Sequence, residues 1–252
     1  MIELSLTAYI LLFFLIFLAG FVDSIAGGGG LISVTSYYAF GLPPLYVLGN
    51  NKFASTFGTL FALGVYRKNH SVNFKIGLFT AAFSFVGSIL GSQLAILYSD
   101  LFLKYLMLIA VPVIAFFTLK KPKLQRESLL SGSTLYLVCA ILGFVIGVYD
   151  GFFGPGTGMF LTLAFTSIIG FSILDACGNT KLVNLSSNIA ALTSFIIHGN
   201  IIYKIAIPCL FASILGNLVG STVAVKGGGK IVKSVMVCVL ALLFIKILWE
   251  FI

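Results

Sequence analysis

The sequence predicts an all-α polytopic membrane protein built from two inverted repeats of about five helical segments each. Three observations support this prediction. Only 9% of the 252 residues are charged, against roughly 25% in soluble domains. Uncharged apolar runs recur at 4–22, 77–99 and 129–149, and each is long enough to cross a bilayer, which takes about 20 residues. Polar and glycine positions of the first half also recur in the second half.

This internal duplication keeps a nearly constant offset. The segment GFVDSIAGGGG at 20–30 matches GVYDGFFGPGT at 147–157, 127 residues later, and GNNK at 49–52 matches GNTK at 178–181, 129 residues later. Chance does not keep one offset across so many polar and glycine positions, so the chain is a duplicated unit. The predicted domains are a first transmembrane repeat, a basic cytoplasmic linker and a second transmembrane repeat, at 1–121, 122–128 and 129–252.

Each predicted unit contains a long apolar helix, a glycine-rich break, a short apolar segment, a polar turn and three further helices. In the first unit the helical segments are expected at 5–26, 31–41, 50–66, 75–98 and 101–119. In the second unit they are expected at 129–150, 157–170, 179–197, 204–225 and 231–250. The segments 31–41 and 157–170 are too short to span a bilayer alone at about 1.5 Å per residue, so they are half-helices or parts of broken helices.

The basic residues predict the orientation of the two units. Most of them fall in the loops 67–75, 120–127 and 226–233, and an excess of Lys and Arg in short loops marks the cytoplasmic side. These loops share one side only if each unit crosses the membrane an odd number of times, which inverts the second unit and puts both termini outside. The net charge of +8 is therefore an orientation signal, and nucleic-acid binding is not expected. The chain should lie in the cell membrane as a multi-pass protein.

The glycine-rich breaks at 27–30 and 154–158 are candidate parts of an anion site. A broken helix leaves unpaired backbone groups, which a membrane tolerates only where they face protein or a watery cavity. The helix after each break presents free N–H groups and its positive dipole end, which suits an anion. Close helix packing is the alternative, because glycine also favours it in membranes. The candidate substrate-binding residues here are Gly29, Gly30, Gly156 and Thr157.

A polar stripe follows each break on the next long helix. Lys52 and Ser55 share one helix face, and the matched helix carries Lys181 and Asn184 at the same spacing. Amides and hydroxyls are hydrogen-bond donors suited to sulfonate, sulfite or carboxylate oxygens. For the lysines, snorkelling from a helix N-terminus to the interface is an equal alternative. The candidate substrate-binding residues of the stripes are Asn50, Lys52, Ser55, Asn179, Lys181, Asn184 and Asn188.

The matched aspartates Asp23 and Asp150 have a coupling or structural role. They could take up protons in a coupling step, or they could cap the breaks by accepting backbone N–H bonds. Capping is favoured, and pairing with Lys181 or Lys52 is left open. The four cysteines lack disulfide or metal spacing, so no metal site and no cofactor are expected. Without a nucleophile–base or paired-carboxylate motif, the chain is not expected to be an enzyme.

Two pairs of motifs resemble the TauE/SafE family of sulfite and organosulfonate exporters. In the first unit they are DSIAGGGGLI at 23–32 and GNNKFASTFG at 49–58; in the second they are YDGFFGPGTG at 149–158 and NTKLVNLSSN at 179–188. The resemblance covers essentially the whole chain. It implies a multi-helix transporter of sulfite, of sulfonates such as sulfoacetate or of related small anions, coupled to an ion gradient. Thr35 departs from the family pattern, which usually has Pro there.

The residues and the resemblance together favour a secondary-active transporter that exports sulfite or an organosulfonate by alternating access between the two inverted repeats. The expected partners are the small anionic substrate, the lipid bilayer and a coupling ion, either a proton or sodium. A homodimer is left open. A passive anion channel is the alternative within transport. A membrane scaffold or assembly protein is the alternative from another class, although it would not need matched polar stripes inside the bilayer.

Overall fold

The structure of the protein is a computed structural model, which describes residues 4–103, 105 and 130–250. Within these residues the long elements are all helices, and four of them, α1, α4, α6 and α9, are long and apolar enough to cross a membrane. The expected all-α membrane class is thus confirmed. The bounds are α1 Leu6–Ala26, α2 Gly29–Ala39, α3 Pro44–Lys68, α4 Phe74–Leu97, α6 Gly132–Phe152, α7 Thr157–Ser167, α8 Ile173–Ile197 and α9 Tyr203–Glu250. Most of the helix expected at 101–119 lies outside the described residues.

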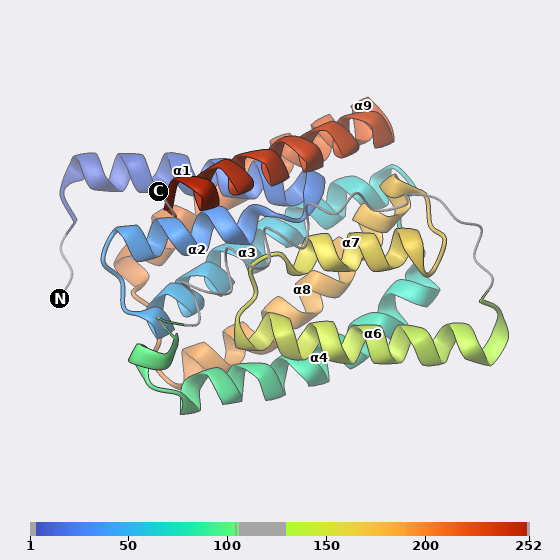
Figure 1. Cartoon of the computed structure of the whole chain (residues 1–252), viewed down its shortest axis with the longest axis horizontal. Helices are drawn as coiled ribbons and strands as arrows, with labels where there is room; N and C mark the ends of the chain where they lie inside the picture. Colours follow the sequence, from blue (N-terminus) through green and yellow to red (C-terminus); the bar gives the residue numbers. More distant parts are fainter. Residues whose placement is uncertain (1–3, 104, 106–129, 251–252) are drawn as a thin grey trace.

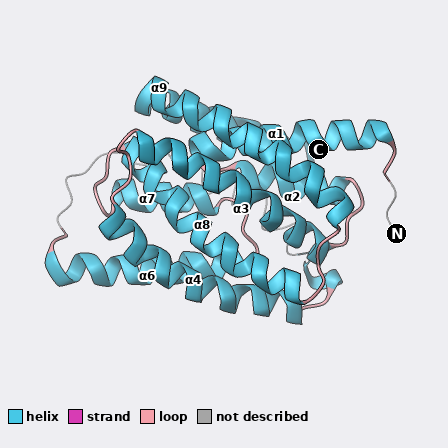
Figure 2. Cartoon of the chain, turned by 180° about the vertical axis from the view of Figure 1, so that it is seen from behind, coloured by secondary structure: helices cyan, strands magenta, loops and turns pink. Residues whose placement is uncertain are grey.

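The helices are arranged in layers (Figure 1). One outer layer contains α1 and α9, the other contains α4 and α6, and the middle layer contains α2, α3, α7 and α8. The view from behind in Figure 2 shows the same order. The middle layer holds the two short helices and the two polar long helices, so the most polar segments of the chain are covered on both sides by apolar ones.

The outer layers exchange helices between the two units in the same way. Gly87 on α4 lies so close to α6 that an added Cβ would be 2.3 Å from the Phe144 carbonyl oxygen. Gly216 on α9 is its counterpart at the offset of 129, and a Cβ there would be 2.1 Å from the Phe17 carbonyl oxygen on α1. Such close backbone approach is the packing that glycine permits in membrane helices. Each outer layer therefore contains one helix from each unit: α1 of the first with α9 of the second, and α4 of the first with α6 of the second.

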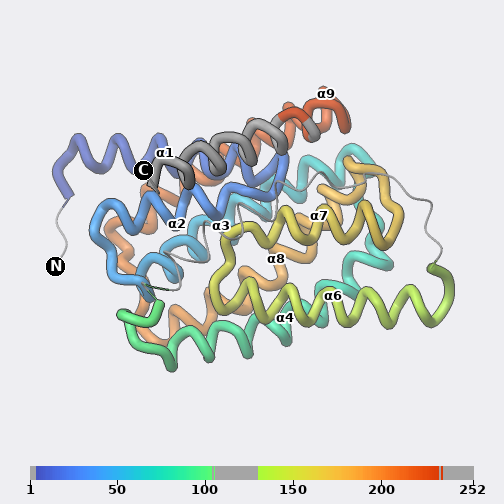
Figure 3. The backbone as a smooth tube through the Cα atoms, viewed as in Figure 1, coloured from blue at the N-terminus to red at the C-terminus, as the bar shows by residue number. Residues whose placement is uncertain are grey.

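The direction of the chain can be followed in Figures 1 and 3. The helix α1 runs from the N-terminal end of the bundle, whereas its counterpart α6 starts at the opposite end and runs back. The end of α3 at Lys68 and the kink of α9 at Gly228 lie together at that opposite end. Two of the three predicted basic loops thus share one end of the bundle, while 120–127 lies outside the described residues. The inverted relation and the cytoplasmic side remain predictions.

The helices α3 and α8 begin six residues earlier than the sequence suggested. We expected starts at 50 and 179, but α3 begins at Pro44 and α8 at Ile173. Proline is preorganised for the first helical turn. Ser172 caps α8, because its hydroxyl oxygen accepts a hydrogen bond from the Asp175 N–H at 3.2 Å. The glycines that looked like turn residues are contact sites instead: a Cβ on Gly49 would lie 2.0 Å from the Asn200 carbonyl oxygen.

Candidate functional site

The two glycine-rich breaks meet in the middle layer. Gly27 ends α1 in the left-handed conformation, with φ +76°, and a Cβ there would lie 2.2 Å from the Gly158 carbonyl carbon. The Met159 N–H donates to the Gly27 carbonyl oxygen at 3.1 Å, so the breaks satisfy part of each other's backbone. Because α2 and α7 both begin here, two positive helix ends converge on one region.

The polar stripes of α3 and α8 face this region. Lys52 and Lys181 are among the largest fully buried side chains, with exposed fractions of 2% and 1%. Lys52 lies eight residues after the start of α3, about 12 Å along the helix at 1.5 Å per residue. Neither lysine is therefore near a helix N-terminus, and the snorkelling alternative is wrong for both.

Each lysine forms an ion pair with the aspartate of the other unit. The Lys52 ammonium lies 2.7 Å from an Asp150 carboxylate oxygen, and the Lys181 ammonium lies 2.7 Å from an Asp23 carboxylate oxygen. Lys52 also donates to the Asn188 amide oxygen at 2.9 Å, and Lys181 donates to the Asp23 carbonyl oxygen at 2.6 Å. The pairing that the sequence left open is thus formed twice, at matched positions, across the two units.

The structure corrects the capping role that the sequence favoured for Asp23 and Asp150. Within the described part of the chain, the carboxylates of Asp23 and Asp150 pair with lysine ammonium groups. The hydrogen bond that closes the end of α1 goes instead from the Gly27 N–H to the Asp23 carbonyl oxygen, at 2.8 Å. The physical reason is burial. An isolated charge inside a membrane protein is costly, so an oppositely charged ammonium is a better partner than the partial charge of an N–H group.

The two ion pairs are not equivalent in exposure. Asp150 has a side-chain exposure of 3%, whereas Asp23 has 18%. Two lysines and two aspartates give the cluster no formal net charge, which suits a low-dielectric interior. The cluster is therefore formally neutral. The Asp23 carboxylate is the most accessible of its four charged groups.

A small polar cavity lies between the ion pairs and the breaks, with a volume of about 20 Å³. A space of that size holds about one water molecule. Among the residues predicted from the sequence, those that reach this cavity are Asp23, Gly30, Lys52, Ser55, Asp150, Gly156, Asn184 and Asn188. Asn184 lines this cavity, and its amide N–H group is the part of the side chain that can donate to an anion oxygen.

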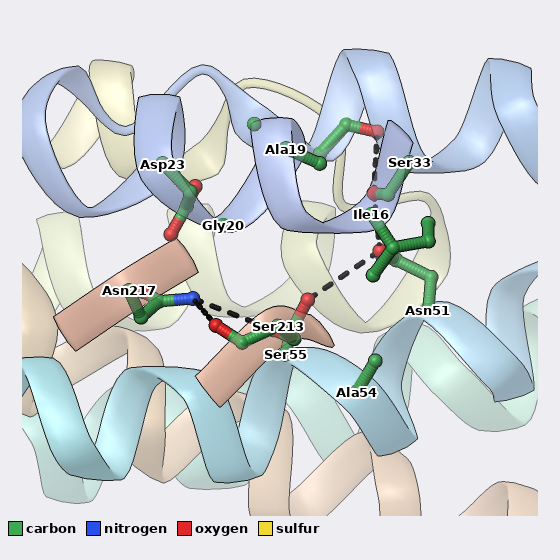
Figure 4. A pocket seen from close by; sticks show the side chains of 12 residues that line it. Ile16, Ala19, Gly20, Asp23, Ser33, Asn51, Ala54, Ser55, Ser213 and Asn217 are labelled. Carbon is green, nitrogen blue, oxygen red and sulfur yellow. Dashed lines mark hydrogen bonds between the residues drawn. The ribbon is translucent and has the colours of Figure 1, made fainter. Parts of the chain in front are cut away.

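A second polar cavity of about 10 Å³ adjoins the first on the side of α1, α3 and α9 (Figure 4). The two cavities share Asp23, Gly30, Asn51 and Ser55. Asn51 was not predicted, although it lies one turn before Ser55, and Ser33 on α2 donates to its amide oxygen at 2.6 Å. Asn51 and Ser55 are four residues apart on one helix, and this spacing could have identified Asn51 as a member of the polar stripe.

Asn217 and Ser213 on α9 also line the second cavity, and neither was predicted from the sequence. The Asn217 amide nitrogen donates to the Ser213 carbonyl oxygen at 2.9 Å. They lie in a long apolar helix of the second unit, and they reach the site only because α9 packs against α1 of the first unit. No local sequence pattern predicts that contact.

Five predicted residues lie outside the central cavity between the ion pairs. Asn50 and Asn179 donate their amide N–H to the carbonyl oxygens of Tyr46 and Asp175 on their own helices, at 2.7 and 2.8 Å. The Thr157 hydroxyl donates to the Gly154 carbonyl oxygen at 2.7 Å. Gly29 lines only the second cavity. Lys181 reaches the site through Asp23.

Comparisons with known proteins identify the family of the chain. The profile of the family described as "Sulfite exporter TauE/SafE" matches residues 12–247. The chain is 38% identical over 237 residues to the probable membrane transporter protein ORF9 of Sinorhizobium sp, covering 94% of this chain and 91% of that protein. It is 34% identical over 239 residues to the probable membrane transporter protein YfcA of Escherichia coli strain K12, covering 95% and 89%.

A more distant relative is the probable membrane transporter protein YdhB of Bacillus subtilis strain 168, 28% identical over 218 residues, with 84% of this chain and 87% of that protein covered. No solved structure matches the chain. The family profile spans both breaks and both polar stripes. The chain is a multi-pass membrane protein that belongs to the TauE/SafE family of sulfite-exporter-type membrane transporters.

Proposed function

We propose that the protein is a secondary-active transporter of a small anion, with sulfite or an organosulfonate as the cargo that it exports. The observation that supports this most is the central cavity, which lies in the middle layer between two converging helix ends and two buried lysines. Positive helix ends and lysine ammonium groups attract an anion. The amides of Asn184 and Asn188 add polar groups that can bind its oxygens.

The size of the cavity favours a carrier over a passive channel. Sulfite has four non-hydrogen atoms, and a space of about 20 Å³ holds about one water molecule. The anion therefore enters only when the packed breaks and stripes move apart. Such a movement of one unit against the other around a central site is alternating access.

The opposite directions of α1 and α6 in Figure 1 support an inverted relation between the units. In an inverted pair, rocking in one direction opens the site to one side of the membrane, and rocking in the other direction opens it to the other side. The cross-unit ion pairs Lys52–Asp150 and Lys181–Asp23 lie where these movements would act. Alternating access would thus break and re-form one pair at a time.

An anion screen on the purified full chain tests this function. Sulfite, methanesulfonate, sulfoacetate and acetate are added separately, and thermal unfolding is followed in detergent. A bound anion at 100 times its dissociation constant stabilises the folded state by about 2.7 kcal/mol. We expect stabilisation by sulfite or a sulfonate, and uptake of the same anion into liposomes that contain the protein.

The alternatives give different results in the same experiments. A passive channel would let the anion equilibrate across the liposome membrane without accumulating it under any ion gradient. A scaffold or assembly protein would show neither stabilisation nor flux with any of the four anions. Either result would contradict secondary-active transport.

A further inference from the structure

The unequal exposure of the two ion pairs identifies a coupling site. We propose that Asp23 takes up one proton when the anion binds, so that anion and proton bind together. This inference rests on the proposed function and deepens it by naming the co-substrate. The route to Asp23 is the second polar cavity, in which Figure 4 shows the carboxylate projecting from α1 on the side of Asn217.

The charge balance of the site requires a compensating positive charge. The cluster of Lys52, Lys181, Asp23 and Asp150 is neutral without a ligand. A monovalent anion would bring the buried site to a net charge of −1, and uncompensated charge is costly in a membrane interior. A proton on Asp23 changes the cluster to +1, so the complex with the anion is neutral again.

Protonation also releases the group that attracts the anion. The Lys181 ammonium is held by the Asp23 carboxylate at 2.7 Å. When a proton from water adds to the carboxylate, Asp23 becomes a neutral acid and its attraction for Lys181 falls. The ammonium can then pair with an anion oxygen. No covalent bond other than the O–H of Asp23 is formed or broken.

Exposure selects Asp23 over Asp150. The Asp23 side chain is 18% exposed and adjoins a cavity of about 10 Å³, which has room for about one water molecule. The Asp150 side chain is 3% exposed, and its lysine is held further by Asn188. Gly30 lines the cavity beside Asp23, and its counterpart in the sequence of the second unit is Thr157, a larger residue.

The surroundings favour a proton over sodium as the coupling ion. A sodium ion on the Asp23 carboxylate would lie close to the Lys181 ammonium, since that ammonium is 2.7 Å from the same carboxylate, and two cations so close repel each other. The other titratable groups that face this part of α1 are Lys52 and Asp150 across the central cavity. Tyr66 and Cys177 also donate to carbonyl oxygens of α1, next to Asp23.

The test counts protons during anion binding. Methanesulfonate has no group that titrates near neutral pH, so calorimetry in buffers of different ionisation enthalpy gives the protons that the protein itself takes up. We expect about one proton per anion for the parent chain. We expect none for Asp23→Asn, which mimics the protonated acid. For sulfite, which titrates itself, the count is the difference between the parent and Asp23→Asn.

The pH dependence gives a second readout. In the parent, the dissociation constant should rise by up to about tenfold per pH unit as the pH increases, because one proton is linked to binding. In Asp23→Asn it should not change with pH. The proton count of the parent needs no variant, so a poorly folded Asp23→Asn would not prevent the test.

Anion binding to the parent without proton uptake, or with a requirement for sodium, would overturn the proposal while leaving the transport function intact. If neither methanesulfonate nor sulfite binds to the folded parent, the proposed function itself is wrong, and this inference is wrong with it.

Discussion

At the scale of single residues, the sequence identified the four charged side chains that form the two ion pairs, but not which lysine pairs with which aspartate. Lys52 and Lys181 were identified because they recur at one offset, and so were Asp23 and Asp150. Their partners could not be assigned, since each ion pair joins two units whose arrangement is a tertiary property. Local spacing reports only which residues share a face of one helix.

The enclosed ion pair should be important for stability. Lys52→Met leaves the Asp150 carboxylate buried without its ammonium partner, and breaking a buried pair from one side costs about 3–5 kcal/mol. Asp150→Asn should destabilise for the same reason. The double variant should lose less stability than the sum of the two single variants, because it leaves no unpaired charge. Unfolding in detergent by a denaturant titration measures all three, and additive losses would contradict a direct pair.

Two asparagines of α8, Asn184 and Asn179, offer a test of the site with an internal control. Asn184 lines the central cavity, where its amide N–H group can donate to an anion. The Asn179 amide nitrogen donates to its own helix, and Asn179 does not line that cavity. A hydrogen bond to a charged ligand contributes about 1.5–3 kcal/mol. Asn184→Ala should therefore raise the dissociation constant of the best anion roughly ten- to hundred-fold.

Asn179→Ala should leave that constant within about threefold, since it removes a buried amide of the same kind outside the cavity. Both variants are compared by calorimetry on protein whose folding has been checked. Equal effects of the two substitutions would place the anion elsewhere.

At the scale of elements, the sequence predicted the order of the helices and the position of the breaks, but it misplaced the starts of α3 and α8. The segments around Gly49 and Gly178 contain the residue types of a turn. Their glycines instead allow a neighbouring backbone to approach the helix, with Asn200 and Ser71 carbonyl oxygens about where the Cβ atoms would be. The same residue type serves both purposes, and only the tertiary contact distinguishes them.

The contact between the two breaks should be intolerant of a methyl group. Gly27→Ala introduces a Cβ 2.2 Å from the Gly158 backbone at a residue with φ +76°, so strain and overpacking combine to a loss of at least about 2 kcal/mol. Gly64→Ala is the matched control. Gly64 is inside α3 with nothing within 4 Å of an added Cβ, so alanine should be neutral or stabilise by up to about 1 kcal/mol.

The two alanine variants are compared by thermal unfolding in the same detergent. A Gly27→Ala protein as stable as the parent would mean that the breaks do not pack against each other, and the central site would lose its structural basis.

At the scale of the whole molecule, the duplication was readable because it left matched polar residues and glycines in an apolar chain. Its structural form is the exchange of helices, in which α4 packs on α6 and α9 packs on α1 through glycines at matched positions. The sequence could not predict this exchange, since the apolar faces of all the outer helices look alike. It puts α9 residues into the site of the first unit, which explains why Asn217 was missed.

The orientation of this assembly can be tested through its basic loops. Asn69 follows α3, and Lys230 follows the α9 kink, so both lie at one end of the bundle, while Gly199 follows α8 at the other end (Figure 1). Positive loops face the cytoplasm. In a chain whose own cysteines are replaced by alanine, Asn69→Cys and Lys230→Cys should resist a membrane-impermeant maleimide in intact cells and react after permeabilisation. Gly199→Cys should react without permeabilisation, and transport by each variant verifies its fold.

Labelling of position 230 from outside, with position 69 still protected, would show that the kink of α9 and the end of α3 lie on different sides, and the inverted repeat would be wrong. Reversal of all three positions would keep the inverted repeat and overturn the cytoplasmic assignment of its basic end.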